Sequence, residues 1–414
     1  MPNRFEEIEE EVLREPDEKP YVREREEEVS EPNDRLESLD EAFLKNPHLV
    51  NEGFRSAEEI FKHWGAESKV PVPERLAPLL RFKAFNDTVL AVQEISDEPP
   101  LTDRRGFRQF EKLAEKELKA ESDPYLPTIG TEIEIPRSLP VRGNRLALFE
   151  ASRKLGIPKT GTQDEEWEFA VPYTYSAEAQ NAYLHELIRG GYIETEESDE
   201  GKRIKAGGRG TFSLHLNIEI PKDVTRGRPE FTEHAHLDPF HLAATRLSFA
   251  LSSAFSSAER ITNREYVHPV IWGHSSEWSK PKRKQARDSE DNESARRLEI
   301  RSLEVRDQTL YRLLHEIQNL SAALFSEFRT ERDGAEEILA GIWERFHEAS
   351  DDLARQYGVS PFGLDLGETE KTLKIATAIH SSDFQKEMRS LVTSFSQEVE
   401  IVLDEARKKR EQIN

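Results

Sequence analysis

Thr211-Phe212-Ser213-Leu214-His215-Leu216-Asn217-Ile218-Glu219-Ile220 alternates strictly between apolar and polar side chains after its first residue. Because successive side chains of a β-strand point to opposite faces, this period of two predicts a strand with one apolar and one polar face. The polar face carries Ser213, His215, Asn217 and Glu219. The stretch therefore predicts a sheet that covers a core with one face and presents polar groups on the other.

Two earlier stretches repeat this pattern. In Thr131-Glu132-Ile133-Glu134-Ile135 the two glutamates share one face. Their Cα atoms would be about 6.6–7 Å apart, close enough for the carboxylates to share a pair of metal ions. Residues 164–171 place apolar side chains inward and two carboxylates outward, those of Glu166 and Glu168.

A later stretch, Arg297-Leu298-Glu299-Ile300-Arg301-Ser302-Leu303-Glu304-Val305-Arg306, changes parity along its length. Its first half puts Glu299 and Arg301 on the polar face, whereas the apolar residues after position 302 have the opposite parity. A β-bulge or a bend near Ser302 would reconcile the two halves.

The polar faces have two interpretations. An antiparallel sheet with one face in water gives such alternation routinely, so each face taken alone favours simple exposure to solvent. Together the four faces favour a function, because glutamate and histidine are not favoured in strands and yet recur on the same side. Carboxylates with one imidazole, in a chain without cysteine, match Mg²⁺ or Mn²⁺ better than zinc.

The order of these motifs resembles that of the carboxylate–amine ligase superfamily, which includes glutamate–cysteine ligase, glutamine synthetase and the amidoligases. Gly130-Thr131-Glu132-Ile133-Glu134 is similar to the Gly-x-Glu-x-Glu of the family's first strand, and Glu168-Phe169-Ala170-Val171-Pro172 to its Glu-Phe-x-x-Pro. Ser213-Leu214-His215-Leu216-Asn217 is similar to a strand whose histidine contacts metal or phosphate, and residues 297–305 to a late Glu-Val-Arg-Ser-Leu-Asp strand. The resemblance covers about residues 125–325.

The resemblance implies an ATP- and Mg²⁺- (or Mn²⁺-) dependent enzyme that joins a glutamate-like carboxylate to an amine through an acyl phosphate. It implies that Arg301 contacts the transferred phosphoryl group and that His215 lies near metal or phosphate, which makes both catalytic candidates. Asp164 would be an upstream acidic residue of the second-strand motif, but its spacing to Glu168 is shorter than in the family. The family's pocket for a cysteine substrate is not identifiable in this sequence, so the acceptor amine stays open. The implied metal ligands are Glu132, Glu134, Glu168, His215 and Glu299.

A glycine-rich loop, Lys205-Ala206-Gly207-Gly208-Arg209-Gly210, precedes the His215 strand. Its glycines allow a close approach of the backbone to phosphate, which makes Lys205 and Arg209 nucleotide-binding candidates together with Arg301. A plain connection after an acidic turn at 194–200 is the alternative. Phosphoryl transfer needs positioning and charge neutralisation more than a nucleophilic side chain, which agrees with the lack of a Gly-x-x-x-x-Gly-Lys-[Ser/Thr] motif.

Two other functions are compatible with the same sequence pattern. One is a hydrolase or deamidase of amide bonds that retains Mg²⁺ and nucleotide as cofactors while water attacks. The other is a catalytically inactive, ligase-like scaffold that binds partners through its termini. Release of amine without net ATP consumption would indicate the hydrolase, and failure to bind Mg–ATP would indicate the scaffold.

Helical patterns surround the strands, so we expect an α+β fold of the glutamine synthetase and glutamate–cysteine ligase type, with helices on one face of an antiparallel-rich sheet. The expected divisions are an acidic disordered tail at 1–40, a helical region at 41–124, a catalytic core at 125–330 and C-terminal helices at 331–414. Helices are expected at 56–64 with a serine cap, 107–120, 176–190, 239–260, 309–329, 334–357 and about 368–412.

Charge and hydropathy exclude several classes of protein. The 414 residues carry a formal net charge of −23, and residues 1–40 hold 16 acidic against 6 basic side chains, which predicts a solvating tail. Acidic residues follow the basic run at 280–287 directly, so nucleic-acid binding is not expected. No apolar stretch approaches the ~20 residues of a membrane span and no signal-peptide core is present. We expect a soluble cytoplasmic enzyme for small molecules, with C-terminal helices forming bundle or homo-oligomer contacts.

Overall fold

The structure is a computed structural model that describes most of the chain after residue 47. Within several strands the backbone is described and some side chains are not. The acidic tail expected at 1–40 lies outside the described residues. The described residues are 48–91, 98–136, 151–157, 159–161, 166–190, 192, 195–198, 201–204, 213–225, 239–255, 282–283, 296–303, 307–359 and 383–413.

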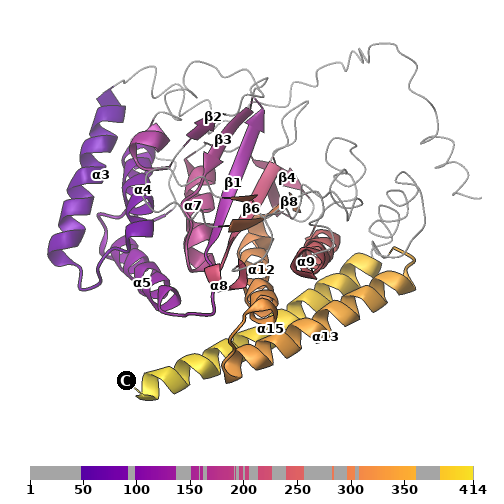
Figure 1. The fold of residues 1–414 in the computed structure, drawn as a ribbon. Coiled ribbons are helices and arrows are strands. Elements are labelled where there is room, and N and C mark those ends of the chain that lie inside the picture. The colour runs from indigo at the N-terminus through magenta and orange to yellow at the C-terminus, as the bar shows by residue number, and fades with distance from the viewer. Residues whose placement is uncertain are drawn as a thin grey trace, which may run out of the picture.

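An antiparallel sheet of six strands lies at the centre of the fold, in the order β2-β3-β1-β6-β8-β7 (Figure 1). The four strands expected from the sequence are its four central ones. The chain is therefore an α+β protein with an antiparallel sheet. The strands are β1 (Ile129–Pro136), β2 (Lys159–Gly161), β3 (Glu166–Ala170), β6 (Ser213–Ile220), β7 (Lys282–Arg283) and β8 (Arg296–Leu303).

A β-bulge interrupts the pairing of β6 with β8. Leu216 is opposite Ile300 but Leu214 is opposite Leu303, so two residues of β8 stand opposite a single residue of β6. The extra residue falls at positions 301–302 and restores Leu303 to the apolar face. The change of parity in the sequence predicted a bulge near position 302, and the register confirms it.

Helices α7 (Ala177–Arg189), α9 (Pro239–Phe255) and α12 (Asp307–Phe328) contact the sheet. Figure 1 shows α7 and α12 running behind the strands. The buried Gln180 of α7 accepts a hydrogen bond from the Thr131 hydroxyl (2.7 Å) and donates to the carbonyl of Ile129 (3.2 Å). Because Thr131 lies on the opposite face of β1 from Glu132, α7 covers the apolar face and not the face of the glutamates.

Helix caps explain most of the boundaries. The helix expected at 176–190 is α7, and Ser176 caps its start and Gly190 its end. Asp103 caps α5 (Arg104–Glu121), close to the expected 107–120. The expected start of the first helix at Ser56 was wrong, because α3 (His48–Glu67) begins earlier and Ser56 is an interior residue. Its apolar stripe starts at Leu49, so packing of that stripe decides the boundary more than the serine does.

The C-terminal helices pack on one another and on α12. Figure 1 shows α13 (Gly334–Gln356) and α15 (Asp383–Ile413) side by side, and α12 contacts both. The apolar stripe of α15 is buried inside this bundle, including Met388, Val392 and Val399. Bundle packing therefore accounts for these residues, and a homo-oligomer stays a prediction. Residues 360–382, part of an expected helix, lie outside the described residues.

A single buried apolar cluster includes side chains from α3, from the sheet and from α15. The division into separate domains stays a prediction. Helix α4 (Ala77–Ala91) lies between α3 and α7, whereas the short η1 (Glu74–Leu76) and α8 (Lys222–Thr225) connect longer elements. The acidic stretch at 194–200 was expected as a turn, but residues 195–198 form strand β4 (Thr195–Ser198), which pairs with β5 (Gly201–Ile204). Among the described helices, none has the length and hydropathy that crossing a bilayer requires.

Candidate functional site

The register of the central strands gathers the polar positions on one face of the sheet. Glu132 is opposite His215 on β6, and Glu134 is opposite Glu168 on β3. Asn217 is opposite both Gly130 on β1 and Glu299 on β8. Directly opposite residues of neighbouring strands share a face, so these positions form one surface, which we call the polar sheet face.

Two ionisable side chains at the centre of this face are described in full, and both are largely withdrawn from solvent. His215 is 3% exposed and the Glu132 side chain 13% exposed. The His215 Nδ1 atom lies 4.0 Å from Glu132 Oε2. A carboxylate and an imidazole therefore point at the same small volume.

Arg297 supplies the cation of the polar sheet face. It stands opposite Glu219, yet its guanidinium donates to Glu132 Oε1 at 2.5 Å. To reach Glu132 on β1, the Arg297 side chain therefore crosses β6 near the position of Asn217. The sequence pointed to Arg301 as the phosphate-binding arginine, but Arg301 lies in the bulge and its side chain is outside the described part. Arg297 is two residues before Glu299 and so shares its face of the strand. This spacing is the sequence signal that could have identified Arg297 as a site residue.

Tyr173 covers the same place from a segment that the sequence did not single out. Its hydroxyl contacts Arg297, and burial raises its pKa to about 12, although the Arg297 guanidinium lowers it. The phenol therefore keeps its proton at neutral pH and can donate a hydrogen bond. The aromatic ring lies directly over Gly130, where a Cβ atom would be 3.1 Å from three ring carbons. A glycine at this position lets the ring approach the strand.

Asn217 is a buried amide without partners. It is 1% exposed, and neither its Nδ2 nor its Oδ1 atom has a hydrogen-bond partner among the described residues. Leaving such a group unpaired costs about 1–3 kcal/mol. The neighbouring Glu219, in contrast, accepts a hydrogen bond from the Thr128 hydroxyl at 2.6 Å. An unpaired amide on the polar sheet face indicates that water or a ligand meets it there.

The donor set of this face fits a hard divalent cation. Two ligand atoms of one octahedral Mg²⁺ are about 3 Å apart when adjacent and about 4.2 Å apart when opposite. The 4.0 Å between the nearest atoms of Glu132 and His215 lies within that range. By register, Glu134 and Glu299 lie on the same face, on opposite sides of this pair. Arg297 leaves the second carboxylate oxygen of Glu132 available, so ion pairing and metal binding are compatible.

Several predicted site residues stay predictions because their side chains lie outside the described part. For Glu134, Glu168 and Glu299 the register gives the face of the strand and nothing further. Asp164, Lys205 and Arg209 lie outside the described residues altogether.

A second acidic cluster, formed by Glu98, His185 and Glu186, lies away from the sheet. The ammonium of Lys83 is 3.0 Å from a Glu98 oxygen and 3.1 Å from a Glu186 oxygen, so a cation of the chain already neutralises it. We interpret it as a structural ion-pair network rather than a metal site.

Comparisons with known proteins leave the function open. No known family model and no curated protein matches the sequence. One solved structure, described as a "novel glutamine synthase homolog", is similar over 72% of this chain and 74% of its own chain. The identity is 12% and the TM-score is 0.29, a likeness too weak to support an argument about activity. The polar sheet face has to carry the functional argument.

The contact between Gly130 and Tyr173 can be tested by one methyl group. Gly130→Ala is expected to displace the Tyr173 ring and to lower the free energy of unfolding by about 1–3 kcal/mol, measured by urea denaturation. Gly341 of α13, which has open space around its Cβ position, provides the control. Gly341→Ala is expected to stabilise the protein by about 0.5–1 kcal/mol. Equal effects of the two substitutions would contradict the packing of Tyr173 on β1.

Proposed function

We propose that this chain is an ATP- and Mg²⁺-dependent ligase that joins a glutamate-like carboxylate to an amine through an acyl phosphate. The observation that supports the proposal is the register of β3, β1, β6 and β8, which gathers four glutamates and a histidine on the polar sheet face. A face with carboxylates, an imidazole and an arginine suits a metal-bound nucleotide triphosphate.

Each described side chain has a role that follows from its position. Arg297 offers a planar fork of N–H donors to a phosphoryl group and carries its charge at every relevant pH. Tyr173 donates from a phenol that stays protonated, and its contact with Arg297 restricts where the guanidinium can lie. Glu132 and His215 would hold a metal ion at the centre of the face. Glu134 and Glu168 on one side of them and Glu299 on the other would serve further ions. When bound, the ion neutralises phosphate charge that would otherwise repel the substrate carboxylate.

The reaction needs no nucleophilic side chain of the protein. A carboxylate oxygen of the substrate attacks the γ-phosphorus of ATP, the bond to the β-phosphate oxygen breaks, and ADP leaves. The amine nitrogen then attacks the acyl carbon, the carbon–oxygen bond to phosphate breaks, and the nitrogen loses a proton. The products are an amide, ADP and inorganic phosphate. Positioning and charge neutralisation supply the catalysis.

The first test is an assay of ADP release with Mg–ATP and a panel of amino acids as carboxylates and of small amines as acceptors. We expect release that requires one carboxylate, one amine and a divalent metal, with Mn²⁺ able to replace Mg²⁺. Glu299→Ala is expected to abolish it. Because a lost metal ligand affects the chemical step, the variant should remain folded by circular dichroism.

Three other outcomes would contradict the ligase. ADP release that no pair of substrates stimulates would indicate a simple ATPase. Amine release without net ATP consumption would indicate an amide hydrolase on the same fold. An absence of Mg–ATP binding in calorimetry would indicate a scaffold without activity.

A further inference from the structure

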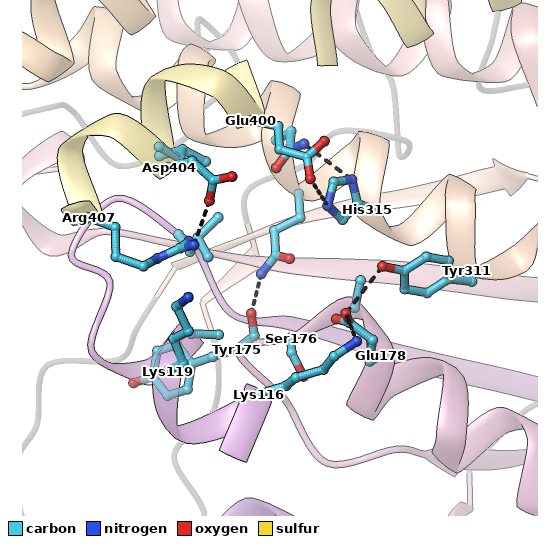
Figure 2. Close-up of a pocket in the computed structure, with 16 residues that line it drawn as sticks. Lys116, Lys119, Tyr175, Ser176, Glu178, Tyr311, His315, Glu400, Asp404 and Arg407 are labelled. Atoms are coloured by element: carbon cyan, nitrogen blue, oxygen red, sulfur yellow. Dashed lines mark hydrogen bonds and ion pairs between the residues drawn. The ribbon is translucent and has the colours of Figure 1, made fainter. Parts of the chain in front are cut away.

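A cavity on the other side of the sheet has a chemistry that the proposed ligase site does not use. It has a volume of about 220 Å³ and lies between α5, α7, α12 and α15 (Figure 2). Helix α7 separates it from the polar sheet face, because α7 packs on the apolar face of β1. The volume is below the roughly 300–1,000 Å³ of pockets for drug-sized ligands, so it suits a small metabolite.

The inner wall of the cavity holds a fixed hydrogen-bond acceptor. Gln318 lines the cavity and is 3% exposed. Its Nε2 atom donates to the carbonyls of Pro127 (2.8 Å) and Tyr175 (2.6 Å), which uses both N–H groups and sets the orientation of the amide. The amide oxygen has no partner among the described residues, so it can accept a hydrogen bond from a ligand in the cavity.

His315 adds an imidazole to the lining, one helical turn before Asn319 on α12. Its Nδ1 atom lies 3.2 Å from the Asn319 amide nitrogen. His315 Nε2 is 3.7 Å from a carboxylate oxygen of Glu400 on α15, too far for a hydrogen bond. Figure 2 shows His315, Tyr311 and Glu178 on one side of the cavity, with Lys119 and Arg407 on the other.

The charges of the lining balance, and two ion pairs leave Lys119 and Glu400 without a lysine, arginine or carboxylate partner in the lining. Lysine or arginine and carboxylate side chains line the cavity in equal number, so its formal charge is zero with neutral histidine. Lys116 pairs with Glu178 at 2.8 Å, and Arg407 pairs with Asp404 at 2.7 Å. Lys119, at the rim, has no anionic partner among the described residues. A neutral, polar lining disfavours both a nucleotide and an apolar ligand.

The Glu178 carboxylate is ionised and only partly used. Lys116 and Tyr311 both donate to its Oε1 atom, at 2.8 and 3.2 Å. Although burial opposes it, the hydrogen bond from Lys116 holds the pKa of Glu178 below its usual value. Among the described residues, no other side chain donates to its Oε2 atom. The cavity thus offers the Lys119 cation at one side, the Glu178 carboxylate at the other and the Gln318 amide oxygen on its inner wall.

From this arrangement we infer that the cavity binds a free amino acid as a zwitterion. Its carboxylate would lie at Lys119, and its ammonium would donate to the Gln318 amide oxygen and to the Glu178 carboxylate. The two charged ends of the ligand match the two sides of the cavity, and its zero net charge matches the lining. This site is separate from the polar sheet face and needs neither nucleotide nor metal.

Isothermal titration calorimetry of the full chain tests the inference, in buffer with EDTA and without ATP. The probes are L-alanine, L-aspartate, L-glutamate and L-glutamine, with succinate and putrescine as ligands that carry only one kind of charge. We expect at least one amino acid to bind and neither control ligand to do so. Lys119→Met should weaken binding at least tenfold, and Lys119→Arg should keep most of it.

Lys112→Met is the matched control, because Lys112 is an exposed lysine of the same helix that does not line the cavity. It is expected to leave binding unchanged. The inference is overturned if no amino acid binds at millimolar concentration, if succinate binds as well as the amino acids, or if Lys119→Met has no effect. Binding lost in Glu132→Gln but kept in Lys119→Met would place the amino acid on the polar sheet face instead, which would favour the proposed ligase while refuting this site.

Discussion

Glu132→Gln is expected to lower kcat/KM for ADP release on the order of 10³-fold or more. The substitution keeps the size of the side chain but removes the charge that Arg297 and a metal ion would share. Loss of one preorganised charged group at a reacting phosphate costs several kcal/mol of transition-state stabilisation. Initial rates of ADP release at saturating Mg–ATP, with the concentration of the carboxylate substrate varied, give kcat/KM for that substrate.

Glu58→Gln provides the control for this substitution. It breaks an arginine–glutamate pair of similar length, Arg81–Glu58 at 3.1 Å, but on the surface and away from the sheet. It should leave kcat/KM within twofold of the wild-type value. An active Glu132→Gln enzyme would show that the Glu132–Arg297 pair serves the fold rather than the reaction.

Arg189→Met is expected to cause the largest loss of stability, about 3–5 kcal/mol in the free energy of unfolding. Arg189 donates to Asp87 at 2.5 Å and to Glu186 at 2.7 Å, and all three side chains are at most 8% exposed. Methionine fills similar space but leaves two buried carboxylates that Lys83 alone cannot neutralise. Breaking one partner out of a buried ionic network is costly for this reason. Urea denaturation followed by circular dichroism measures the change.

The matched control is Arg345→Met, which removes an exposed pair with Glu398 at 2.7 Å. Pairs of this kind contribute about 0–1 kcal/mol, so the loss should be small. Similar losses for the two variants would mean that water reaches and screens the Arg189 network.

The alternation of side chains predicted the sheet well, because a period of two leaves few other structures. It gave the four central strands and their polar faces, and the parity change after Arg301 gave the bulge. The bounds expected for α7 also agree with the structure, because Ser176 and Gly190 act through local backbone groups at its two ends. Local chemistry of this kind is visible in the sequence.

Other features depend on contacts between distant segments, and the sequence did not show them. The start of α3 follows from burial of Leu49 against other helices, not from the serine at position 56. Tyr173 reaches the site from a short segment without periodicity, and only its ring over Gly130 reveals it. The contact of Arg297 with Glu132 depends on the diagonal reach of a long side chain. The role of Arg301 stays a prediction, because its side chain is outside the described part.

The measurement that tests the polar sheet face most directly is binding of Mn²⁺ in the presence of a non-hydrolysable ATP analogue, followed through the electron paramagnetic resonance signal of free Mn²⁺. We expect the wild-type chain to bind the ion, Glu132→Gln to weaken binding at least tenfold, and Glu58→Gln to match the wild type. Binding that is equally tight in Glu132→Gln, or no binding by the wild-type chain, would contradict a metal–nucleotide site on this face.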